Sequence, residues 1–218
     1  MGGIHKILHP LGDSGVLQTV LSQFAKAESI AEAVIVCRAQ DREEFDQAVR
    51  ELPGLPFPVS AVNGGATRQE SVKNGVSAVS ERCAYIAVHD GARPLVAPED
   101  IERVIADARR TGAATLGVPV KDTIKTVVNG VITDTPERSL LWQTQTPQVF
   151  RRSLYLDAMA RAAAEGKDYT DDCQLVEALG AQVTMTEGSY RNIKLTTPED
   201  FLIAEAFLRA AKGEDPNA

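Results

Sequence analysis

Two oppositely charged side chains, Asp90 and Arg93, follow directly on residues 84–88, an uncharged and mostly apolar segment. Such a segment is typical of a strand that is buried on both faces. Ligands of open parallel sheets bind just outside the carboxyl ends of the strands, where a carboxylate can hold Mg²⁺ and a guanidinium can bind a phosphate. The alternative is an ion pair that closes an ordinary loop, and these two residues alone favour neither interpretation.

The segments around this loop alternate between the patterns of buried strands and of amphipathic helices. The expected strands are residues 33–37, 57–62, 84–88 and 114–120. The expected helices are residues 17–24, 41–52, 68–79 and 98 to about 110. This alternation predicts an α/β protein with three layers, α/β/α, in which helices cover both faces of a mostly parallel sheet.

The last third of the chain is less regular. Residues 140–150 are polar and contain a proline, which predicts a loop or a short extended piece that returns to the sheet. Thr170 is the expected N-cap of a helix that ends at Gly180, with two acids in its first turn. The other expected elements are helices at 151–165 and 201–212 and strand-like segments at 182–186 and 192–195.

A β-hairpin is expected where Asn129-Gly130 separates two runs of β-branched residues, 124–128 and 131–133. Asn-Gly is the strongest short hairpin signal, because both turn positions need positive φ. The hairpin would have one apolar face that it cannot bury alone. We therefore expect an arm over about residues 124–140 that packs against a second subunit.

Bulk properties exclude several classes of protein. The length and composition fit a single domain over residues 1–218. No apolar run reaches the ~18 residues of a membrane span, and the amino terminus lacks the apolar core of a signal peptide. We therefore expect a cytoplasmic protein without a membrane partner. A net charge of -7 argues against a nucleic-acid partner, and three widely spaced cysteines suggest neither a disulfide framework nor a zinc site.

Several motifs, taken in order, give the chain a resemblance to one family. They are Gly64-Gly65-Ala66-Thr67-Arg68-Gln69-Glu70-Ser71-Val72, His89-Asp90-Gly91-Ala92-Arg93-Pro94, Pro119-Val120-Lys121-Asp122-Thr123, Thr144-Gln145-Thr146-Pro147-Gln148, Thr170-Asp171-Asp172 and Asn192-Ile193-Lys194-Leu195-Thr196. Each motif alone is weak, but their combination resembles the 2-C-methyl-D-erythritol 4-phosphate cytidylyltransferase family of isoprenoid precursor synthesis. The resemblance covers nearly the whole chain and implies a Rossmann-like nucleotidyltransferase sheet with a protruding hairpin arm.

The resemblance implies an enzyme that transfers CMP from CTP to the phosphate of 2-C-methyl-D-erythritol 4-phosphate and releases pyrophosphate. The acceptor phosphate has a second pKa of about 6, so it is mostly dianionic at neutral pH and can attack the α-phosphorus unaided. Two polyanions must be brought together, so positioning, cations and Mg²⁺ should supply the catalysis. The expected cofactor is Mg²⁺. The expected partners are CTP, the sugar-alcohol phosphate and a second copy of the chain, bound through the arm.

Carried over position by position, the resemblance implies three sets of site residues. The residues at the nucleotide would be Gly64, Gly65 and Ser71. The residues at the acceptor would be Asp90, Arg93, Thr123, Thr146 and Thr170, with Asp90 also at the metal. The catalytic cations would be Lys6, Lys194 and Arg138, and Arg138 would act on the neighbouring subunit's site. The family has Gln and an aromatic residue after the first of these lysines, where this chain has Ile7 and Leu8.

Simpler interpretations stay open for some of these residues. Lys194 could be a solvated lysine at a sheet edge, and Ser71 could cap its helix or face solvent. For His89, at a strand end and without metal-ligand spacing, a hydrogen-bonded structural role is favoured over that of a base.

The start of the chain departs from the family pattern. The family begins with a central strand and an Ala-Ala-Gly-x-Gly-x-Arg-Met loop that wraps the triphosphate, whereas the printed sequence begins at Met1-Gly2-Gly3, which resembles the end of that loop. A sheet without this strand would have two unpaired edges. Three interpretations are open: a piece of a longer chain, a misassigned start, or a truncated relative without catalysis. The alternative functions are a ribitol-5-phosphate cytidylyltransferase and a non-catalytic scaffold that dimerises through the hairpin.

Overall fold

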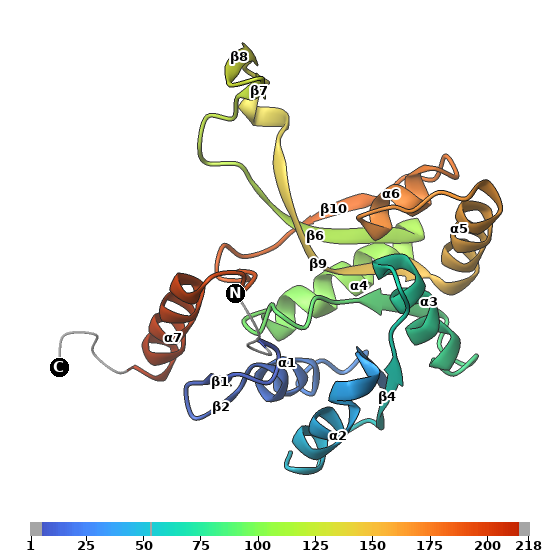
Figure 1. The fold of residues 1–218 in the computed structure, drawn as a ribbon, viewed down its shortest axis with the longest axis vertical. Coiled ribbons are helices and arrows are strands. Elements are labelled where there is room, and N and C mark those ends of the chain that lie inside the picture. Colours follow the sequence, from blue (N-terminus) through green and yellow to red (C-terminus); the bar gives the residue numbers. More distant parts are fainter. Residues whose placement is uncertain (1–5, 53, 214–218) are drawn as a thin grey trace.

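The computed structural model describes residues 6–52 and 54–213 of the chain (Figure 1). Its largest sheet has four strands in the order β10-β6-β9-β5. Their bounds are β5 Tyr85–Val88, β6 Ala113–Pro119, β9 Trp142–Arg151 and β10 Thr184–Glu187. β10 is parallel to β6, whereas β9 is antiparallel to both of its neighbours, β6 and β5.

A second sheet holds the parallel strands β3 (Ala33–Cys37) and β4 (Val59–Asn63). No ladder within the described residues joins this pair to β5. The continuous sheet that the alternation predicts is therefore divided in two, and β5 is an edge strand. A short antiparallel pair, β1 (Pro10–Leu11) and β2 (Ser14–Gly15), precedes the first helix.

Helices cover both faces of the four-stranded sheet. The helices of the described chain are α1 Val16–Phe24, α2 Arg42–Arg50, α3 Arg68–Ala78, α4 Pro98–Thr111, α5 Arg152–Glu165, α6 Asp172–Glu177 and α7 Pro198–Lys212. Of these, α2 packs on β3 and β4, and α7 packs beside β1. Val149 packs with α1 and α4, and its neighbour Phe150 packs with α3, α5 and α6. Successive strand residues point to opposite faces, so these two clusters lie on the two sides of the sheet. The predicted three-layer α/β/α arrangement is confirmed.

The sequence determines where α4 and α7 begin and end. Both have proline at the first helical position and acids in the first turn, which the helix dipole favours. Gly112 and Gly213 end them in the left-handed conformation, with φ of 94° and 74°. In the described part of the chain, no helix has the length and apolar character that crossing a membrane requires.

Of the two alternatives for residues 140–150, an extended piece that returns to the sheet is confirmed and a loop is not, because most of these residues belong to β9, the strand between β6 and β5. The strand is longer than the short piece expected. The polar composition obscures the strand because three of the polar side chains, Gln145, Thr146 and Gln148, are buried and hydrogen-bonded. Gln145 donates to a main-chain carbonyl of a distant turn, and Gln148 donates to the carboxylate of Asp171 at 2.6 Å. A buried polar side chain with such a partner can occupy a strand as an apolar one does.

Two further expectations near the carboxyl terminus are wrong. Residues 192–195 form no strand, although Leu195 is fully buried and its N–H donates to the carbonyl of Ala92 at 2.8 Å. The burial of apolar side chains beside a loop, rather than in a ladder, produces the strand-like pattern. The N-cap of α6 is Asp171, so the cap expected at Thr170 lies one residue too early.

The predicted hairpin is confirmed as β7 (Thr126–Val128) and β8 (Val131–Asp134). Asn129 and Gly130 both have positive φ, as the turn requires. The arm projects away from the rest of the chain (Figure 1). The apolar side chains of Val127, Val128, Val131 and Ile132 are 53–65% exposed. Val127 pairs with Ile132 and Val128 with Val131, so apolar side chains lie on both faces of the arm rather than on the one face expected. The described residues leave both faces uncovered.

Candidate active site

The loop after β5 places Asp90 between two cations. The ammonium Nζ of Lys194 lies 2.9 Å from Asp90 Oδ2, and Arg93 Nε lies 3.5 Å from the same oxygen. Three of the residues assigned to the site from the sequence are thus brought together at the carboxyl end of β5. The ion pair of the loop-closing interpretation, Asp90 with Arg93, is present as well.

The two cations keep Asp90 ionised in a partly buried place. Burial would raise the pKa of Asp90, but the hydrogen bond and charge of Lys194 and the charge of Arg93 outweigh burial and hold the pKa below its ordinary value. Burial lowers the pKa of Arg93, and the charge of Asp90 opposes this. A guanidinium stays charged at neutral pH, so two positive charges face one negative charge in a chain of net charge -7.

Arg93 is held by main-chain carbonyls as well as by Asp90. Its Nη1 donates to the carbonyl of Asn192 at 2.7 Å, and its Nη2 faces the carbonyl of Thr144 on β9 at 3.5 Å. Its side chain is only 13% exposed. These two carbonyls therefore position the guanidinium, and the binding of a phosphate by Arg93 stays a prediction.

Thr146 and His89 anchor the same loop to β9. Thr146 Oγ1 accepts from the backbone N–H of Asp90 at 3.0 Å and lies 3.0 Å from His89 Nδ1, while His89 Nε2 lies 3.1 Å from the carbonyl of Arg93. A carbonyl only accepts, so Nε2 must carry a proton. Burial lowers the pKa of His89 to about 4, which makes Nδ1 an acceptor at neutral pH. The Thr146 hydroxyl therefore donates to His89, and this histidine has the hydrogen-bonded structural role favoured from the sequence.

The loop between β4 and α3 carries the residues assigned to the nucleotide. The N–H of Gly65 donates to Ser71 Oγ at 2.9 Å, and Thr67 caps α3 by accepting from the N–H of Glu70 at 3.1 Å. A Cβ on Gly65 would stand 2.2 Å from a side-chain carbon of Glu70, and one on Gly64 would stand 2.9 Å from Ser71 Oγ. The loop is thus closed on itself at a helix N-terminus, where backbone N–H groups can meet an anion.

Arg68, the first residue of α3, connects this loop to α6 and to the cluster. Its Nη2 lies 2.5 Å from Asp172 Oδ2, and the other carboxylate oxygen accepts from the buried hydroxyl of Tyr155 at 2.5 Å. Burial would lower the pKa of Arg68, but the hydrogen bond and charge of Asp172, followed by the charge of Asp90, raise it. Asp90 thus acts electrostatically on the start of α3.

The remaining residues assigned from the sequence lie outside the cluster of Asp90, Arg93 and Lys194. Lys6 is half-buried and precedes Ile7, whose side chain is in van der Waals range of the position that a Cβ on Gly91 would take. Thr123 and Arg138 are exposed in and beside the arm, where Arg138 donates to a carbonyl of the arm's base at 2.9 Å. Thr170 is exposed just before α6. No hydrogen bond or ion pair within the described chain joins these four residues to Asp90.

Three residues to which the sequence analysis gives no role lie in or beside the site. Asn192 is fully buried beside Arg93, Gln145 bonds to it, and Arg68 pairs with Asp172. The regular spacing of Gln and Thr over residues 143–146 is the period of a strand, and it could have indicated that Gln145 faces inward. The partners of Arg68 and Asn192 are distant in sequence, and no local pattern indicates them.

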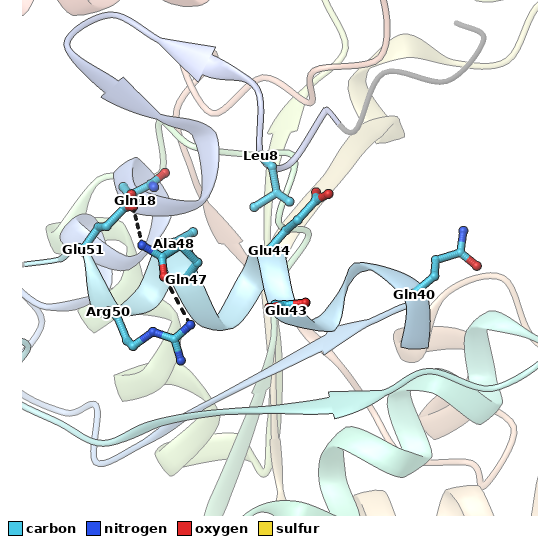
Figure 2. A pocket seen from close by; sticks show the side chains of 9 residues that line it. All are labelled: Leu8, Gln18, Gln40, Glu43, Glu44, Gln47, Ala48, Arg50 and Glu51. Atoms are coloured by element: carbon cyan, nitrogen blue, oxygen red, sulfur yellow. Dashed lines mark hydrogen bonds between the residues drawn. The ribbon is translucent and has the colours of Figure 1, made fainter.

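Two cavities of the described surface lie apart from the cluster. The larger, about 510 Å³, lies over α2 (Figure 2) and is lined by three glutamates, Glu43, Glu44 and Glu51, against Arg50. This charge repels a triphosphate. The smaller, about 330 Å³, lies between α3 and α5 and includes Thr67 and Glu70 of the nucleotide loop. Charge therefore favours the Asp90 cluster over the larger cavity as the place for an anionic substrate.

A metal at this site would depend on the substrate for most of its ligands. Within the described residues, no three His, Cys, Asp or Glu side chains gather as a metal site. Both ion pairs of Asp90 use Oδ2, which leaves Oδ1 for a cation. Mg²⁺ commonly binds through one or two carboxylates together with substrate phosphates and water. Asp90 therefore fits a magnesium ion that arrives with a nucleotide.

Comparison with known proteins identifies relatives over nearly the whole chain. The family model of IspD, 2-C-methyl-D-erythritol 4-phosphate cytidylyltransferase, matches residues 1–210. The protein of that name from Syntrophotalea carbinolica is 47% identical over 212 residues, covering 94% of this chain and 88% of its own length. The one from Caldanaerobacter subterraneus subsp. tengcongensis is 44% identical over 207 residues, covering 94% of this chain and 91% of its own.

Solved structures agree with this relationship. The crystal structure of 2-C-methyl-D-erythritol 4-phosphate cytidylyltransferase from Thermus thermophilus superposes with a TM-score of 0.78 at 32% identity and covers 94% of this chain and 93% of its own. The 4-diphosphocytidyl-2C-methyl-D-erythritol synthase of Anaerococcus prevotii superposes with a TM-score of 0.83 at 29% identity, covering 92% and 88%. The resemblance inferred from the motifs is confirmed, and the chain belongs to the 2-C-methyl-D-erythritol 4-phosphate cytidylyltransferase family.

Proposed function

We propose that this protein transfers CMP from CTP to 2-C-methyl-D-erythritol 4-phosphate and releases pyrophosphate, with Mg²⁺ as its cofactor. The observation that carries the proposal is the cluster of Asp90, Lys194 and Arg93 at the carboxyl end of β5, in a chain 40–47% identical to enzymes named for this reaction. The names of these relatives do not favour ribitol 5-phosphate as the acceptor, nor a non-catalytic scaffold.

The residues of the cluster suit a reaction between two anions. An oxygen of the acceptor phosphate forms a bond to the α-phosphorus of CTP, and the bond from that phosphorus to the β-phosphate oxygen breaks. Lys194 is 44% exposed, so its ammonium can turn from Asp90 to the negative charge that develops on the α-phosphate. Asp90 Oδ1 would hold Mg²⁺, which when bound neutralises phosphate charge. Arg93 and the loop of Gly64, Gly65 and Ser71 would orient the two substrates.

We further propose that the active form is a homodimer in which the arm completes the site of the neighbouring subunit. The exposed apolar side chains of the hairpin and the projection of the arm away from the body of its own chain (Figure 1) support this proposal. Thr123 and Arg138 would then act on the acceptor phosphate, Arg138 from the neighbouring subunit. Lys6 is proposed as a further cation for the triphosphate. The cytoplasmic location stays a prediction from the sequence.

The test is pyrophosphate release from CTP, measured with 2-C-methyl-D-erythritol 4-phosphate and, side by side, with ribitol 5-phosphate. We expect release with Mg²⁺ and the first acceptor, loss of release on chelation, and a loss of about 10²- to 10³-fold in kcat for Lys194→Ala. Lys26→Ala is the matched control, because Lys26 forms no ion pair with a described residue and lies just after α1. Equal turnover of Lys194→Ala and Lys26→Ala, or faster use of ribitol 5-phosphate, would contradict the proposal.

A further inference from the structure

Asn192 joins three segments of the site, although its side chain carries no charge. Its side chain is fully buried. Its main-chain carbonyl accepts from Arg93 Nη1 at 2.7 Å, and its Nδ2 donates to the carbonyl of Thr146 at 2.9 Å and to Gln145 Oε1 at 3.2 Å. These partners belong to the loop after β5 and to β9, while Asn192 itself lies two residues before Lys194.

The chemistry of the partners determines which way the two amides point. Gln145 faces the carbonyl of Ser189, which can only accept, so its NH₂ group must point there and its Oε1 must point to Asn192. Asn192 in turn faces that Oε1 and the carbonyl of Thr146, so both contacts require its NH₂ group. Its own Oδ1 stays buried without a hydrogen-bond partner within the described chain. The fold thus leaves one acceptor unsatisfied while both donors of this amide are used.

We propose that Asn192 is a positioning residue of the transfer reaction, which fastens Arg93 and the segment of Lys194 to β9 so that both cations face Asp90. The proposal rests on the proposed function. Between Asn192 and Lys194 only one residue intervenes, and one residue later the N–H of Leu195 donates to Ala92. The Lys194 backbone is therefore held on both sides by bonds to the frame that carries Asp90 and Arg93.

The rate of a transfer reaction depends steeply on the positions of the groups that stabilise its transition state. An error of about 1 Å in the placement of a reacting or charge-stabilising group can cost about 10²-fold in rate. Lys194 has a long flexible side chain, so the position of its backbone must be fixed if its ammonium is to meet the α-phosphate reproducibly. No hydrogen bond within the described chain joins the nucleotide loop to Asn192, so binding of CTP should depend on this residue much less than transfer does.

The test is a double-mutant cycle. We expect Asn192→Ala to lower kcat/KM for the acceptor by about 10²-fold and to leave the KM for CTP within about twofold. In a Lys194→Ala background the same change should cost about tenfold or less, because only the effect that Asn192 has through Arg93 remains. Asn192→Leu, which fills a similar volume without a charge and removes the NH₂ group, serves if the alanine variant does not fold.

A matched control separates positioning from stability. Thr186 is also buried, and its hydroxyl donates to Asp107 on α4, a helix without site residues. Thr186→Val should lower the free energy of unfolding but leave kcat/KM of the folded enzyme unchanged. An equal loss of kcat/KM in Thr186→Val, or a loss for Asn192→Ala that is as large without Lys194 as with it, would overturn the proposal.

Hydrogen exchange tests the same inference without turnover. In Asn192→Ala the amides of Asp90 and Leu195, which donate to Thr146 Oγ1 and to the carbonyl of Ala92, should exchange faster, while amides of β6 keep their protection. Unchanged exchange at Asp90 and Leu195 would refute the positioning role. Absence of pyrophosphate release by the wild-type protein would refute the proposed function alone, since the exchange result stands independently.

Discussion

His89 should make the stability of this protein fall steeply in mild acid. Burial lowers the pKa of His89 from its ordinary 6.5 to about 4, against the smaller opposing effects of its hydrogen bond to the carbonyl of Arg93 and of the Asp90 charge, while the Arg93 charge acts with burial. The ring of Phe24 contacts the imidazole edge-on, with ring centroids 4.9 Å apart. A proton on Nδ1 would also turn an acceptor of the Thr146 hydroxyl into a second donor.

The size of the loss in stability follows from the pKa of His89 in the unfolded chain and in the folded chain. Above pH 6.5 His89 is neutral in both the folded and the unfolded chain, so it has no effect on the pH dependence of stability. Between pH 6.5 and about 4 the unfolded chain binds a proton that the folded chain does not, so the free energy of unfolding falls as the pH falls. Below about pH 4 both states bind the proton and the loss levels off. The total is about 3 kcal/mol, of which about 2 kcal/mol is lost by pH 5.

The assay is urea unfolding of wild type and His89→Gln between about pH 7 and 4.5. The glutamine variant does not titrate at this position but retains every carboxylate, so the difference between the two proteins isolates the histidine. With an m-value of ~2 kcal/mol per M, the urea midpoint of the wild type should fall about 1 M more than that of the variant by pH 5. Parallel pH profiles for the two proteins would refute the inference that His89 is buried and neutral in the folded state.

Three further changes have definite expected results. Gly65→Ala places a Cβ against the side chain of Glu70, so the KM for CTP should rise about tenfold in steady-state kinetics. An unchanged KM would show that this loop does not bind the nucleotide. Arg68→Ala removes the cation beside the buried Asp172. The free energy of unfolding, measured in urea, should fall by about 1–2 kcal/mol, a modest loss because Arg68 is 40% exposed. An unchanged free energy of unfolding would contradict the pairing of Arg68 with Asp172. Ile132→Asp puts a charge among the exposed apolar side chains of the arm and should convert dimers to monomers, as measured by light scattering. A dimer that persists would argue against the arm as the interface.

The site could be predicted from the sequence where charges interrupt apolar segments. Asp90 and Arg93 stand out because they end a buried strand, and Lys194 because it is a lone cation between apolar residues. The structure brings these three together. The pairing of Arg68 with Asp172 could not be predicted, because 104 residues separate the two and nothing local marks them as partners.

The sequence predicts correctly that helices cover both faces of the sheet, but it predicts one continuous sheet where the structure has two. Alternating strand and helix patterns determine that helices cover both faces, and the hairpin signal at Asn129-Gly130 determines the arm. The same patterns cannot indicate which strands pair, because hydrogen bonding between strands depends on the whole chain. Within the described residues β3 and β4 do not join β5, and Val36 of β3 is 36% exposed.

The polar side chains that conceal β9 in the sequence are also the ones that hold the site. Thr146 accepts from the N–H of Asp90, Gln145 orients Asn192, and Gln148 donates to the acid at the N-cap of α6. Apolar residues at these positions would give a clearer strand pattern but would leave the buried partners unpaired, at a cost of about 1–3 kcal/mol each. β9 therefore departs from the pattern of an ordinary central strand because it fixes loops that are far apart in sequence, and a departure of this kind is expected where a fold supports chemistry.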